Sequence, residues 1–503
     1  MQARTGFGAV LVTLLLACVP SSAAALTFVQ ATGSPYPTTN PPFIPSSAGF
    51  LGGVASGDFN GDGISDLAVV NATGLPVFSA GESVTVLLGS RSGGLTMAPG
   101  SPIEIYSGGL FSSTGAIVTG AFTGDRKLDL AVVNEINHTV SILLGNGTGG
   151  FQSSGTPIPF SGSETASIAV GDFNGDGKQD LAVITNQLNV FLGNGSGAFT
   201  PAPGSPLPLS GFPTSVVAGD FTGNGRSDLA VANGSGYVTV YLSSEAGSFH
   251  AAPGSPLTTN AYPTAIAAAD LTGDGKLDLV TANALSDNVT VLMDDGSGGF
   301  TPSSGSPFPV PAGPNCMPNS APGLPESIAV GDFDANGIPD LAVANSNGCS
   351  DSVAILQGDG GGQFTNASGS PFAANGNPRG LAVGDFNGDG QPDLAVVNPF
   401  LGAVTVLQST TSEPPGQSPG QTAPTGNSGA PQPSNDRPGV PLISGVREKK
   451  TAKCSGVVIH VHHDRRTKTH IKKCSARHVS AAHKGDGSAS RRRLSSHGAR
   501  DRA

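Results

Sequence analysis

The chain has 503 residues, of which 73 are Gly and 40 are Pro, whereas charged residues make up only 12% and Trp is absent. This composition favours many turns and short strands and argues against a helix-rich enzyme. From Pro414 onward there are 17 Lys and Arg against 5 Asp and Glu, so this segment has a net charge of +12. The whole chain has a net charge of −11, so the residues before Pro414 carry −23. An acidic body is therefore followed by a basic tail.

The first 25 residues have the features of a secretory signal peptide, because Arg4 precedes an apolar run from about Ala9 to Val19 and small residues follow up to Ala25. The run is too short for a comfortable membrane span, and no other long apolar run follows. We therefore expect no transmembrane helix and a secreted or cell-surface protein. An alternative is a lipoprotein, since the residues before Cys18 loosely resemble a bacterial lipobox.

The stretch GDFNGDGKQDLAV, which begins at Gly171, has the chemistry of a calcium loop. Its oxygen-bearing side chains surround a glycine, and the backbone carbonyl of Lys178 is available between them; these side chains are Asp172, Asn174, Asp176 and Asp180. The start of the loop matches an EF-hand, but the twelfth position is Val183 in an apolar run instead of the required Glu. The loop is therefore predicted to join two strands.

Seven copies of this loop occur along the chain. Successive copies are separated by 48 to 63 residues, so each period fits one four-stranded propeller blade with loop insertions. The copies begin at Asp58, Ala121, Asp172, Asp220, Asp270, Asp332 and Asp385.

The third copy shows the strands expected within one unit. They cover Ser167–Phe173, Asp180–Thr185, Leu188–Leu192 and Ala198–Ala202. A Gly-Ser-Pro or Gly-Thr-Pro element is predicted to close each unit. It also occurs seven times, and one copy precedes the first loop: the elements begin at Gly33, Gly100, Gly155, Gly204, Gly254, Gly305 and Gly369.

The chain thus begins and ends with half a unit. After the strand that includes Val404 and Leu407 no fourth strand precedes the linker, so the segment from Leu26 to Val29 is predicted to supply the outer strand of the seventh blade. Such pairing removes the open seam of the ring. The predicted fold is all-β, a seven-bladed β-propeller of four-stranded blades closed by the N-terminal strand.

The tandem motif G-D-F-N-G-D-G-x-x-D-L-A-V resembles the FG-GAP or VCBS repeat family, known from the seven-bladed propeller of integrin α subunits and from secreted bacterial proteins. The resemblance covers roughly Leu26 to Gln408 and implies a calcium-loaded propeller used for adhesion or ligand binding, sometimes as an accessory module on an enzyme. The pattern is complete in four loops and keeps three carboxylates in a fifth. The residues that the resemblance implies as Ca²⁺ ligands are Asp58, Asn60, Asp62, Asp66, Asp172, Asn174, Asp176, Asp180, Asp270, Asp274, Asp278, Asp332, Asp334, Asn336, Asp340, Asp385, Asn387, Asp389 and Asp393.

Two loops depart further from the pattern. The loop from Asp220 to Asp228 keeps two carboxylates and should bind more weakly. The loop that starts at Ala121 lacks the first ligand and has Arg126 in place of a Gly, so it is expected to be empty. An Asn-Gly-Asp-Gly hairpin could form without metal, but a turn alone does not explain four oxygen ligands at fixed offsets in separate units. Because the carboxylates repel one another, metal binding is predicted to be linked to folding.

Composition divides the chain into four regions. Residues 1–25 are the signal peptide, 26–408 the propeller, 409–447 a Pro-, Gly-, Ser- and Gln-rich linker predicted to be disordered, and 448–503 a basic tail rich in His, Arg and Lys. An oxidising compartment would allow two disulfides. One would join Cys316 to Cys349 in loops on one face of the propeller, and one would join Cys454 to Cys474 across a small hairpin of the tail.

No G-x-S-x-G, H-E-x-x-H or P-loop motif occurs, so we expect a protein that is not an enzyme. The tail is expected to contact anionic cell-surface polymer, and no nucleic acid is expected because no aromatic platform accompanies its Arg residues.

Two functions stay open. The favoured one is a monomeric binding or adhesion module for an extracellular protein or glycan ligand, and the alternative is an extracellular polysaccharide lyase or hydrolase. The face opposite the cation loops, with long insertions at Asn71–Glu82 and Pro309–Glu326, is the candidate recognition surface.

Overall fold

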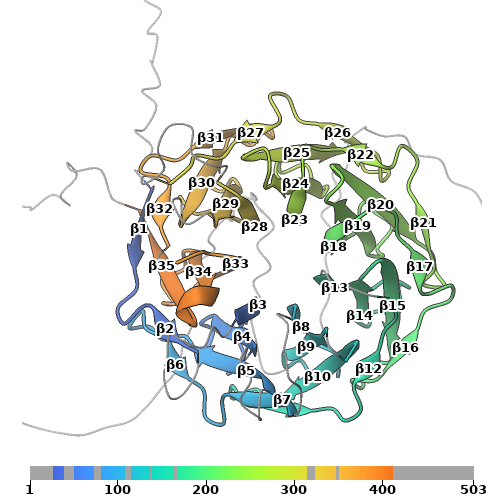
Figure 1. The fold of residues 1–503 in the computed structure, drawn as a ribbon, viewed down its shortest axis with the longest axis horizontal. Coiled ribbons are helices and arrows are strands. Elements are labelled where there is room, and N and C mark those ends of the chain that lie inside the picture. Colours follow the sequence, from blue (N-terminus) through green and yellow to red (C-terminus); the bar gives the residue numbers. More distant parts are fainter. Residues whose placement is uncertain are drawn as a thin grey trace, which may run out of the picture. The chain divides into compact units, whose positions relative to one another are not determined.

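The computed structural model describes residues 26–38, 50–72, 81–107, 115–135, 137–162, 167–313, 323–346, 351–374 and 376–411. They form seven antiparallel sheets, and the innermost strands of neighbouring sheets contact one another around the whole ring (Figure 1). The prediction of an all-β seven-bladed propeller is confirmed. The signal peptide, Cys18, both predicted disulfide pairs and the basic tail lie outside the described residues.

The first three blades follow the same strand order from the centre outward. Blade 1 contains β3 (Phe50–Gly57), β4 (Asp66–Ala72), β5 (Gly81–Leu88), β6 (Thr96–Met97) and β7 (Ile103–Ser107). Blade 2 contains β8 (Ile117–Gly120), β9 (Asp129–Asn134), β10 (Thr139–Gly145), β11 (Phe151–Ser153) and β12 (Ile158–Pro159). Blade 3 contains β13 (Ser167–Gly171), β14 (Asp180–Ile184), β15 (Gln187–Gly193), β16 (Phe199–Pro201) and β17 (Leu207–Pro208).

Blades 4 to 6 repeat this order. Blade 4 contains β18 (Pro213–Gly219), β19 (Asp228–Asn233), β20 (Tyr237–Ser243), β21 (Phe249–Ala251) and β22 (Leu257–Thr258). Blade 5 contains β23 (Pro263–Ala269), β24 (Asp278–Asn283), β25 (Asn288–Asp294), β26 (Phe300–Pro302) and β27 (Phe308–Pro309). Blade 6 contains β28 (Pro325–Gly331), β29 (Asp340–Asn345), β30 (Ser352–Gly358), β31 (Phe364–Asn366) and β32 (Phe372–Ala373).

Blade 7 joins the two ends of the propeller. It contains β33 (Gly380–Gly384), β34 (Asp393–Asn398) and β35 (Ala403–Thr411), with the 3₁₀ helix η1 (Pro399–Leu401) before β35. Two N-terminal strands, β1 (Leu26–Gln30) and β2 (Tyr36–Pro37), pair with β35 on its outer side. The predicted closure by the N-terminal strand is confirmed, and β35 continues to Thr411, past the boundary predicted at Gln408.

The second strand of a blade is buried on both faces, which explains its continuous Asp-Leu-Ala-Val type of sequence. In β19, Leu229 and Val231 pack in the core between blades 3 and 4, whereas Ala230 and Ala232 pack in the core between blades 4 and 5. Successive side chains of a strand point to opposite faces of its sheet. Each blade therefore contributes to two cores, and the propeller has a separate core between each pair of blades.

The outer strand of each blade differs from the prediction of one uninterrupted strand. In blade 3 both β16 and β17 pair with β15, and the Gly-Ser-Pro element lies between them instead of closing the unit. The strand is interrupted there because proline has no backbone N–H to donate to the hydrogen bonds between strands. The hydroxyl of Ser205 accepts the N–H of Val190 in this gap at 2.8 Å. Equivalent bonds are made by Ser34, Ser101, Ser255, Ser306 and Ser370.

The first strand of blade 3 also ends earlier than predicted, at Gly171 instead of Phe173. Phe173 belongs to the loop, because its N–H is donated to the side chain of Asp180. Within the described ranges no helix is long and apolar enough to cross a membrane.

Candidate metal loops

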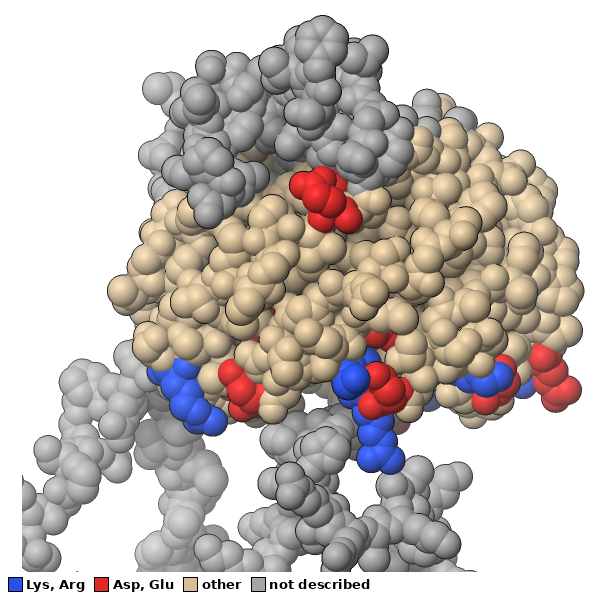
Figure 2. Space-filling view, turned by 90° about the horizontal axis from the view of Figure 1, so that it is seen from below, with Lys and Arg blue, Asp and Glu red and all other residues tan. Residues whose placement is uncertain are grey.

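The seven predicted cation loops each join the first and second strands of a blade, so they all lie on one face of the ring. Backbone bonds connect them to the hairpins of neighbouring blades, such as the N–H of Gly149 to the carbonyl of Phe59 at 2.9 Å. Seen from the side, Lys, Arg, Asp and Glu side chains gather along one edge of the propeller (Figure 2). Three Lys–Asp ion pairs of the loops contribute to this charged edge.

The first acidic residue shapes the backbone of its loop. In blade 3, Oδ1 of Asp172 accepts the N–H groups of Gly175 (2.7 Å) and Asp176 (3.1 Å), and Oδ2 accepts the N–H of Gly177 (2.8 Å). Gly175 and Gly177 have φ of 77° and 79°, a conformation that favours glycine. Asp58 and Asp385 make the same set of bonds in blades 1 and 7.

The third and fifth positions of the loop continue this arrangement. Oδ1 of Asn174 accepts the N–H of Asp176, and Oδ1 of Asp176 accepts the N–H of Lys178, both at 2.9 Å. The loop is thus folded by its own Asp and Asn side chains. Oδ2 of Asp172 and the Oδ1 atoms of Asn174 and Asp176 each accept one of these N–H groups and keep a second lone pair, so the bonds leave acceptor capacity for a cation.

The acidic residue at the ninth position has a structural role that the sequence did not reveal. In blade 3, Asp180 is fully buried, its Oδ2 accepts the N–H of Phe173 (2.9 Å), and its Oδ1 accepts the N–H of Gly193 at the end of β15 (2.7 Å). It therefore fastens the loop to the third strand. The equivalent residues that make both bonds are Asp66, Asp129, Asp228, Asp278, Asp340 and Asp393.

Burial is the main influence on the acidity of these fastening carboxyls. It raises the pKa of Asp66 and Asp180 to about 6 and the pKa of Asp340 and Asp393 to about 7, although two N–H donors oppose the shift. Nearby loop carboxylates add to it by repulsion. A cation in the loop would relieve this repulsion and favour the ionised form.

The sixth loop brings three of the predicted ligands together. Asp332, Asp334 and Asp340 each offer a carboxylate oxygen within 4.8 Å of the other two, and the described residues contain no other such group of three. The third position here is Asp334 instead of the Asn found in three other loops. Its Oδ2 accepts amide N–H groups from Asn336 (3.0 Å) and Gln357 (2.8 Å). Closely spaced carboxylate oxygens are the ligands that Ca²⁺ prefers.

Three loops contain a lysine two residues after the fifth position. The ammonium of Lys178 lies 2.9 Å from Asp176, that of Lys127 lies 3.0 Å from Asp125, and that of Lys276 lies 3.4 Å from Asp274. In loop 5, the backbone N–H and the ammonium of Lys276 lower the pKa of Asp274. The fifth-position carboxylates of these loops therefore already have a positive partner.

The loop that begins at Ala121 keeps its shape without a first carboxylate. Arg126 occupies the position of a Gly with φ of 69°, and Thr123 donates to Asp125 at 3.0 Å. Asp129 still makes both fastening bonds. In the loop of blade 4, Asp220 accepts the N–H groups of Asn224 and Gly225, so two carboxylates remain there. An empty loop 2 and a weaker loop 4 stay predictions.

The predicted recognition surface is described only in part. Asn71 and Glu82 are not loop residues but buried members of β4 and β5, and Pro309 and Glu326 lie in β27 and β28. The inserted residues 73–80 and 314–322 lie outside the described residues.

Comparisons with solved structures reveal distant likenesses. A structure of BBS1N in complex with ARL6DN, soaked with lead, is 13% identical with a TM-score of 0.46, and the match covers 75% of this chain and 98% of that one. A protein from Lactobacillus plantarum is 18% identical with a TM-score of 0.46, covering 67% and 94% of the two chains. A functionally unknown protein from Desulfotomaculum acetoxidans is 13% identical with a TM-score of 0.40, covering 69% and 89%.

No curated protein matches the chain in sequence. The family model for the FG-GAP-like repeat matches five times, at residues 122–183, 182–231, 220–281, 273–343 and 332–396. These matches include the loops and buried second strands of blades 2 to 7, apart from Ala121, and together they extend over more than half of the chain. The chain belongs to the family of FG-GAP-like repeat proteins.

Proposed function

We propose that this protein is a calcium-binding propeller that acts as a non-enzymatic binding or adhesion module for an extracellular protein or glycan. The observation that chiefly supports calcium is the group formed by Asp332, Asp334 and Asp340, whose carboxylate oxygens lie within 4.8 Å of one another. Calcium is favoured over magnesium because the loops offer many oxygen ligands on a flexible backbone.

The proposed role of calcium is stability. The loop carboxylates repel one another, and a cation that binds the folded loop but not the unfolded chain stabilises the fold by mass action. The fastening carboxylate Asp340 connects the sixth loop to Gly358 at the end of β30, so cation binding would also secure the third strand of the blade.

Exposed apolar residues support a binding role for the face opposite the loops. Phe212, Tyr262 and Leu285 are 69%, 44% and 59% exposed. They are neighbours across blades 4 and 5, because the N–H of Gly234 donates to the carbonyl of Phe212, the ring of Tyr262 lies against Gly234, and the N–H of Ala284 donates to the carbonyl of Tyr262. Exposed aromatic side chains in one area are typical of contact surfaces.

The proposal includes export of the protein and a role for its basic C-terminal tail. A signal peptide at residues 1–25 would direct the protein to the cell surface or the medium, and the basic residues after Pro414 would hold it near an anionic polymer.

Two measurements test this function. Scanning calorimetry in calcium and in chelator should show a higher melting temperature with calcium, and equal melting temperatures would contradict the calcium part. The purified protein should bind a reproducible ligand on protein and glycan arrays. The loop variant Asp334→Asn and the wild type are tested for this binding at the same calcium concentration. Incubation of any glycan ligand with the protein should leave it intact, and turnover would favour the lyase or hydrolase.

A further inference from the structure

Blade 4 contains a cavity that is built differently from the corresponding place in the other blades. It has a volume of about 200 Å³ and lies between the connection from blade 3 and the sheet of blade 4. Its wall includes Leu209 and Ser210 of the connection and Pro213 at the start of β18, together with residues of β19 and β20. The strands β19, β20 and β21, which contribute residues to its wall, are seen at the right of Figure 1.

Two tyrosines distinguish this blade from its relatives. Tyr237 pairs with the Asn at the end of the second strand, where other blades have Ser83, Thr139, Asn288, Ser352 and Ala403. Tyr241 pairs with Leu229, where the other blades have Leu or Phe: Leu87, Leu143, Phe191, Leu292, Leu356 and Leu407. Blade 4 alone therefore presents two phenol groups along its third strand.

The hydrogen bonds of blade 4 also differ. In blades 5 and 7 the Asn at the end of the second strand donates to the threonine in the middle of the third strand, as from Asn283 to Thr290 at 2.9 Å. In blades 4 and 6 this Asn instead donates to a carbonyl of the preceding connection, from Asn233 to Ser210 at 2.5 Å and from Asn345 to Pro311 at 3.1 Å. In blade 4 the hydroxyl of Tyr237 also donates to the carbonyl of Ser210, at 3.1 Å.

The hydroxyls of Thr239 and Tyr241 in the cavity wall make no hydrogen bond to another described residue, and neither is among the buried polar atoms that lack a partner, so solvent reaches both. Both residues are half-buried and line the cavity. A hydroxyl that solvent reaches can exchange water for a ligand, and it can both donate and accept a hydrogen bond. The cavity therefore offers two hydroxyls that the fold itself does not use.

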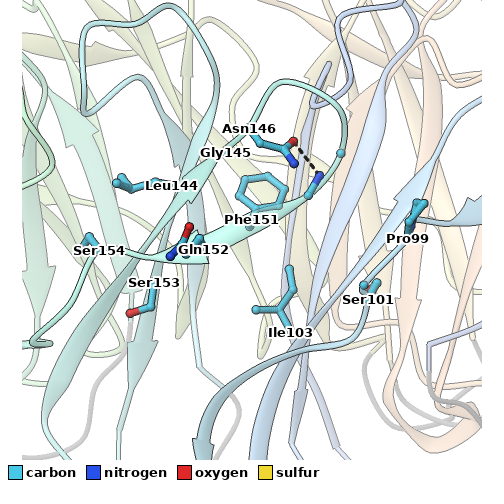
Figure 3. Close-up of a pocket in the computed structure, with 13 residues that line it drawn as sticks. Pro99, Ser101, Ile103, Leu144, Gly145, Asn146, Phe151, Gln152, Ser153 and Ser154 are labelled. Atoms are coloured by element: carbon cyan, nitrogen blue, oxygen red, sulfur yellow. Dashed lines mark hydrogen bonds between the residues drawn. The ribbon is translucent and has the colours of Figure 1, made fainter.

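A larger cavity between blades 1 and 2 lacks this property. It has a volume of about 520 Å³ (Figure 3). The side-chain oxygen of Asn146 accepts the N–H of Gly150 and the hydroxyl of Ser101 accepts the N–H of Val86, so both groups are already used by the fold. The remaining polar side chains on β11, such as Gln152, are exposed to solvent. Among its lining residues the larger cavity therefore has no half-buried polar side chain that the fold leaves free.

The composition of the smaller cavity identifies the ligand class. No charged residue lines it, which argues against an ion or a charged ligand. The wall combines tyrosine rings and the apolar side chains of Leu209 and Val231 with hydroxyl groups. A sugar ring likewise combines C–H faces with hydroxyls, and its hydroxyls can both donate and accept. The volume is below the range of roughly 300–1,000 Å³ of sites for drug-sized ligands, which favours a single ring.

We propose that this cavity of blade 4 binds one ring of a neutral saccharide, with Thr239 and Tyr241 as its hydrogen-bonding residues and the ring of Tyr237 as an apolar wall. The proposal rests on the binding function proposed above and assigns its ligand class and place. Phe212 follows Ser210 by two residues and donates its N–H to Asn233, so its exposed ring stands at the same connection, where a longer glycan would continue.

The test uses saturation-transfer NMR on the full chain with glucose, galactose, mannose, N-acetylglucosamine and their neutral disaccharides, and with galacturonate as a charged comparison. We expect transfer to at least one neutral saccharide and none to galacturonate. Tyr241→Phe and Thr239→Val should each weaken binding roughly five- to tenfold, because each removes one hydrogen bond and little volume. The matched variant Gln152→Ala in the larger cavity should bind like wild type.

Any of three results would contradict the proposed saccharide site. These are no saturation transfer to any neutral saccharide, unchanged saccharide affinity in Tyr241→Phe and Thr239→Val, or an equal loss of affinity in Gln152→Ala. If a variant fails to fold, tyrosine fluorescence of the wild type provides a second measurement of saccharide binding. The chain has 5 Tyr and no Trp, so tryptophan emission does not mask the signal of the cavity tyrosines. Emission unaltered by every saccharide then counts against the site. Calcium-dependent melting, or array binding that persists in Tyr241→Phe, would leave the proposed function intact while the cavity assignment fails.

Discussion

In blade 1, Oδ2 of Asp66 accepts the backbone N–H of Phe59 at 2.9 Å. This bond joins the acidic residue at the ninth position of the loop to the residue at the second position. The other carboxylate oxygen accepts the N–H of Gly89 at 2.8 Å. The same pair of bonds is present at Asp129, in the loop that lacks a first carboxylate. The ninth-position acid therefore secures each blade whether or not the loop has a complete ligand set.

Asp129→Ala should destabilise the protein, although the loop that contains Asp129 is expected to bind no metal ion. The change leaves the buried N–H of Phe122 and the partly buried N–H of Gly145 without an acceptor, at a cost of roughly 2–5 kcal/mol for the two together. Urea unfolding measures the loss, which should be the same in calcium and in chelator. Asp125→Ala, whose side chain is 41% exposed, is the matched control and should change little. Equal stability of both variants would refute a fastening role.

Asp334→Asn should weaken calcium binding at the sixth loop. It removes one of three clustered carboxylates while keeping size and hydrogen-bonding oxygen, and fewer charges lower affinity for Ca²⁺. We expect a decrease of about tenfold for that site, equivalent to 1.4 kcal/mol, in titration calorimetry. Asp125→Asn in the second loop serves as the control. A titration curve identical to wild type would show that loop 6 does not hold the ion.

The stability of the metal-free protein should depend on pH between 5 and 8. Burial raises the folded-state pKa of Asp66 and Asp180 to about 6 and of Asp340 and Asp393 to about 7, above the value of about 4 in an unfolded chain. The folded state binds these protons more tightly, so their contribution to stability is full below pH 4 and is lost as the pH rises through 6 to 7.

The melting temperature in chelator should therefore fall from pH 5 to pH 8, and calcium should reduce the fall because it favours the ionised carboxylates. Calorimetry at several pH values with and without calcium measures both effects. A metal-free melting temperature that rises over this range would contradict the prediction.

Glu82 in blade 1 provides a pH effect away from the loops. It is buried, Asn134 of blade 2 donates to its Oε2 at 2.5 Å, and its Oε1 has no partner. Burial, with repulsion from Glu135, raises the pKa of Glu82 to about 7. Glu82→Gln removes the charge, so it should raise the melting temperature by about 1–3 °C at pH 8 and leave it unchanged at pH 5. The exposed Glu104→Gln is the control, and equal effects at both pH values would exclude a titrating Glu82.

Phe28 should contribute to closing the ring. Its ring packs edge-on against Phe333 (5.8 Å between centroids) and Phe372 (5.0 Å), so the N-terminal strand of blade 7 is held to blade 6. Phe28→Ala should cost about 2–3 kcal/mol in urea unfolding, less than at a fully buried site. The neighbouring Val29 is 54% exposed, so Val29→Ala should cost less than about 0.5 kcal/mol. Similar losses for the two variants would mean that β1 is not held by this contact.

The repeat itself made the fold predictable from sequence. The loops that begin at Asp58 and Asp385 recur in a period that fits one blade, and the half unit at each end required Leu26–Val29 to pair with the last strand, as β1 does with β35. These features are local or follow from counting units. A repeated pattern of glycines, acids and apolar residues directs the same hairpin in each unit.

Contacts between distant residues were decided by the tertiary structure. The sequence marks Asp180 as a loop acid, but only the folded hairpin brings it to the N–H of Gly193. Similarly, Asn134 meets Glu82 because two blades pack together, and Asn233 bonds to Ser210 because the connection from blade 3 lies against the ends of β19 and β20. Such contacts depend on which surfaces of separate units face each other, and no pattern within one unit contains that information. The predicted loop ligands follow from the repeat, whereas the bonds of the fastening acids and the cavity of blade 4 follow from packing.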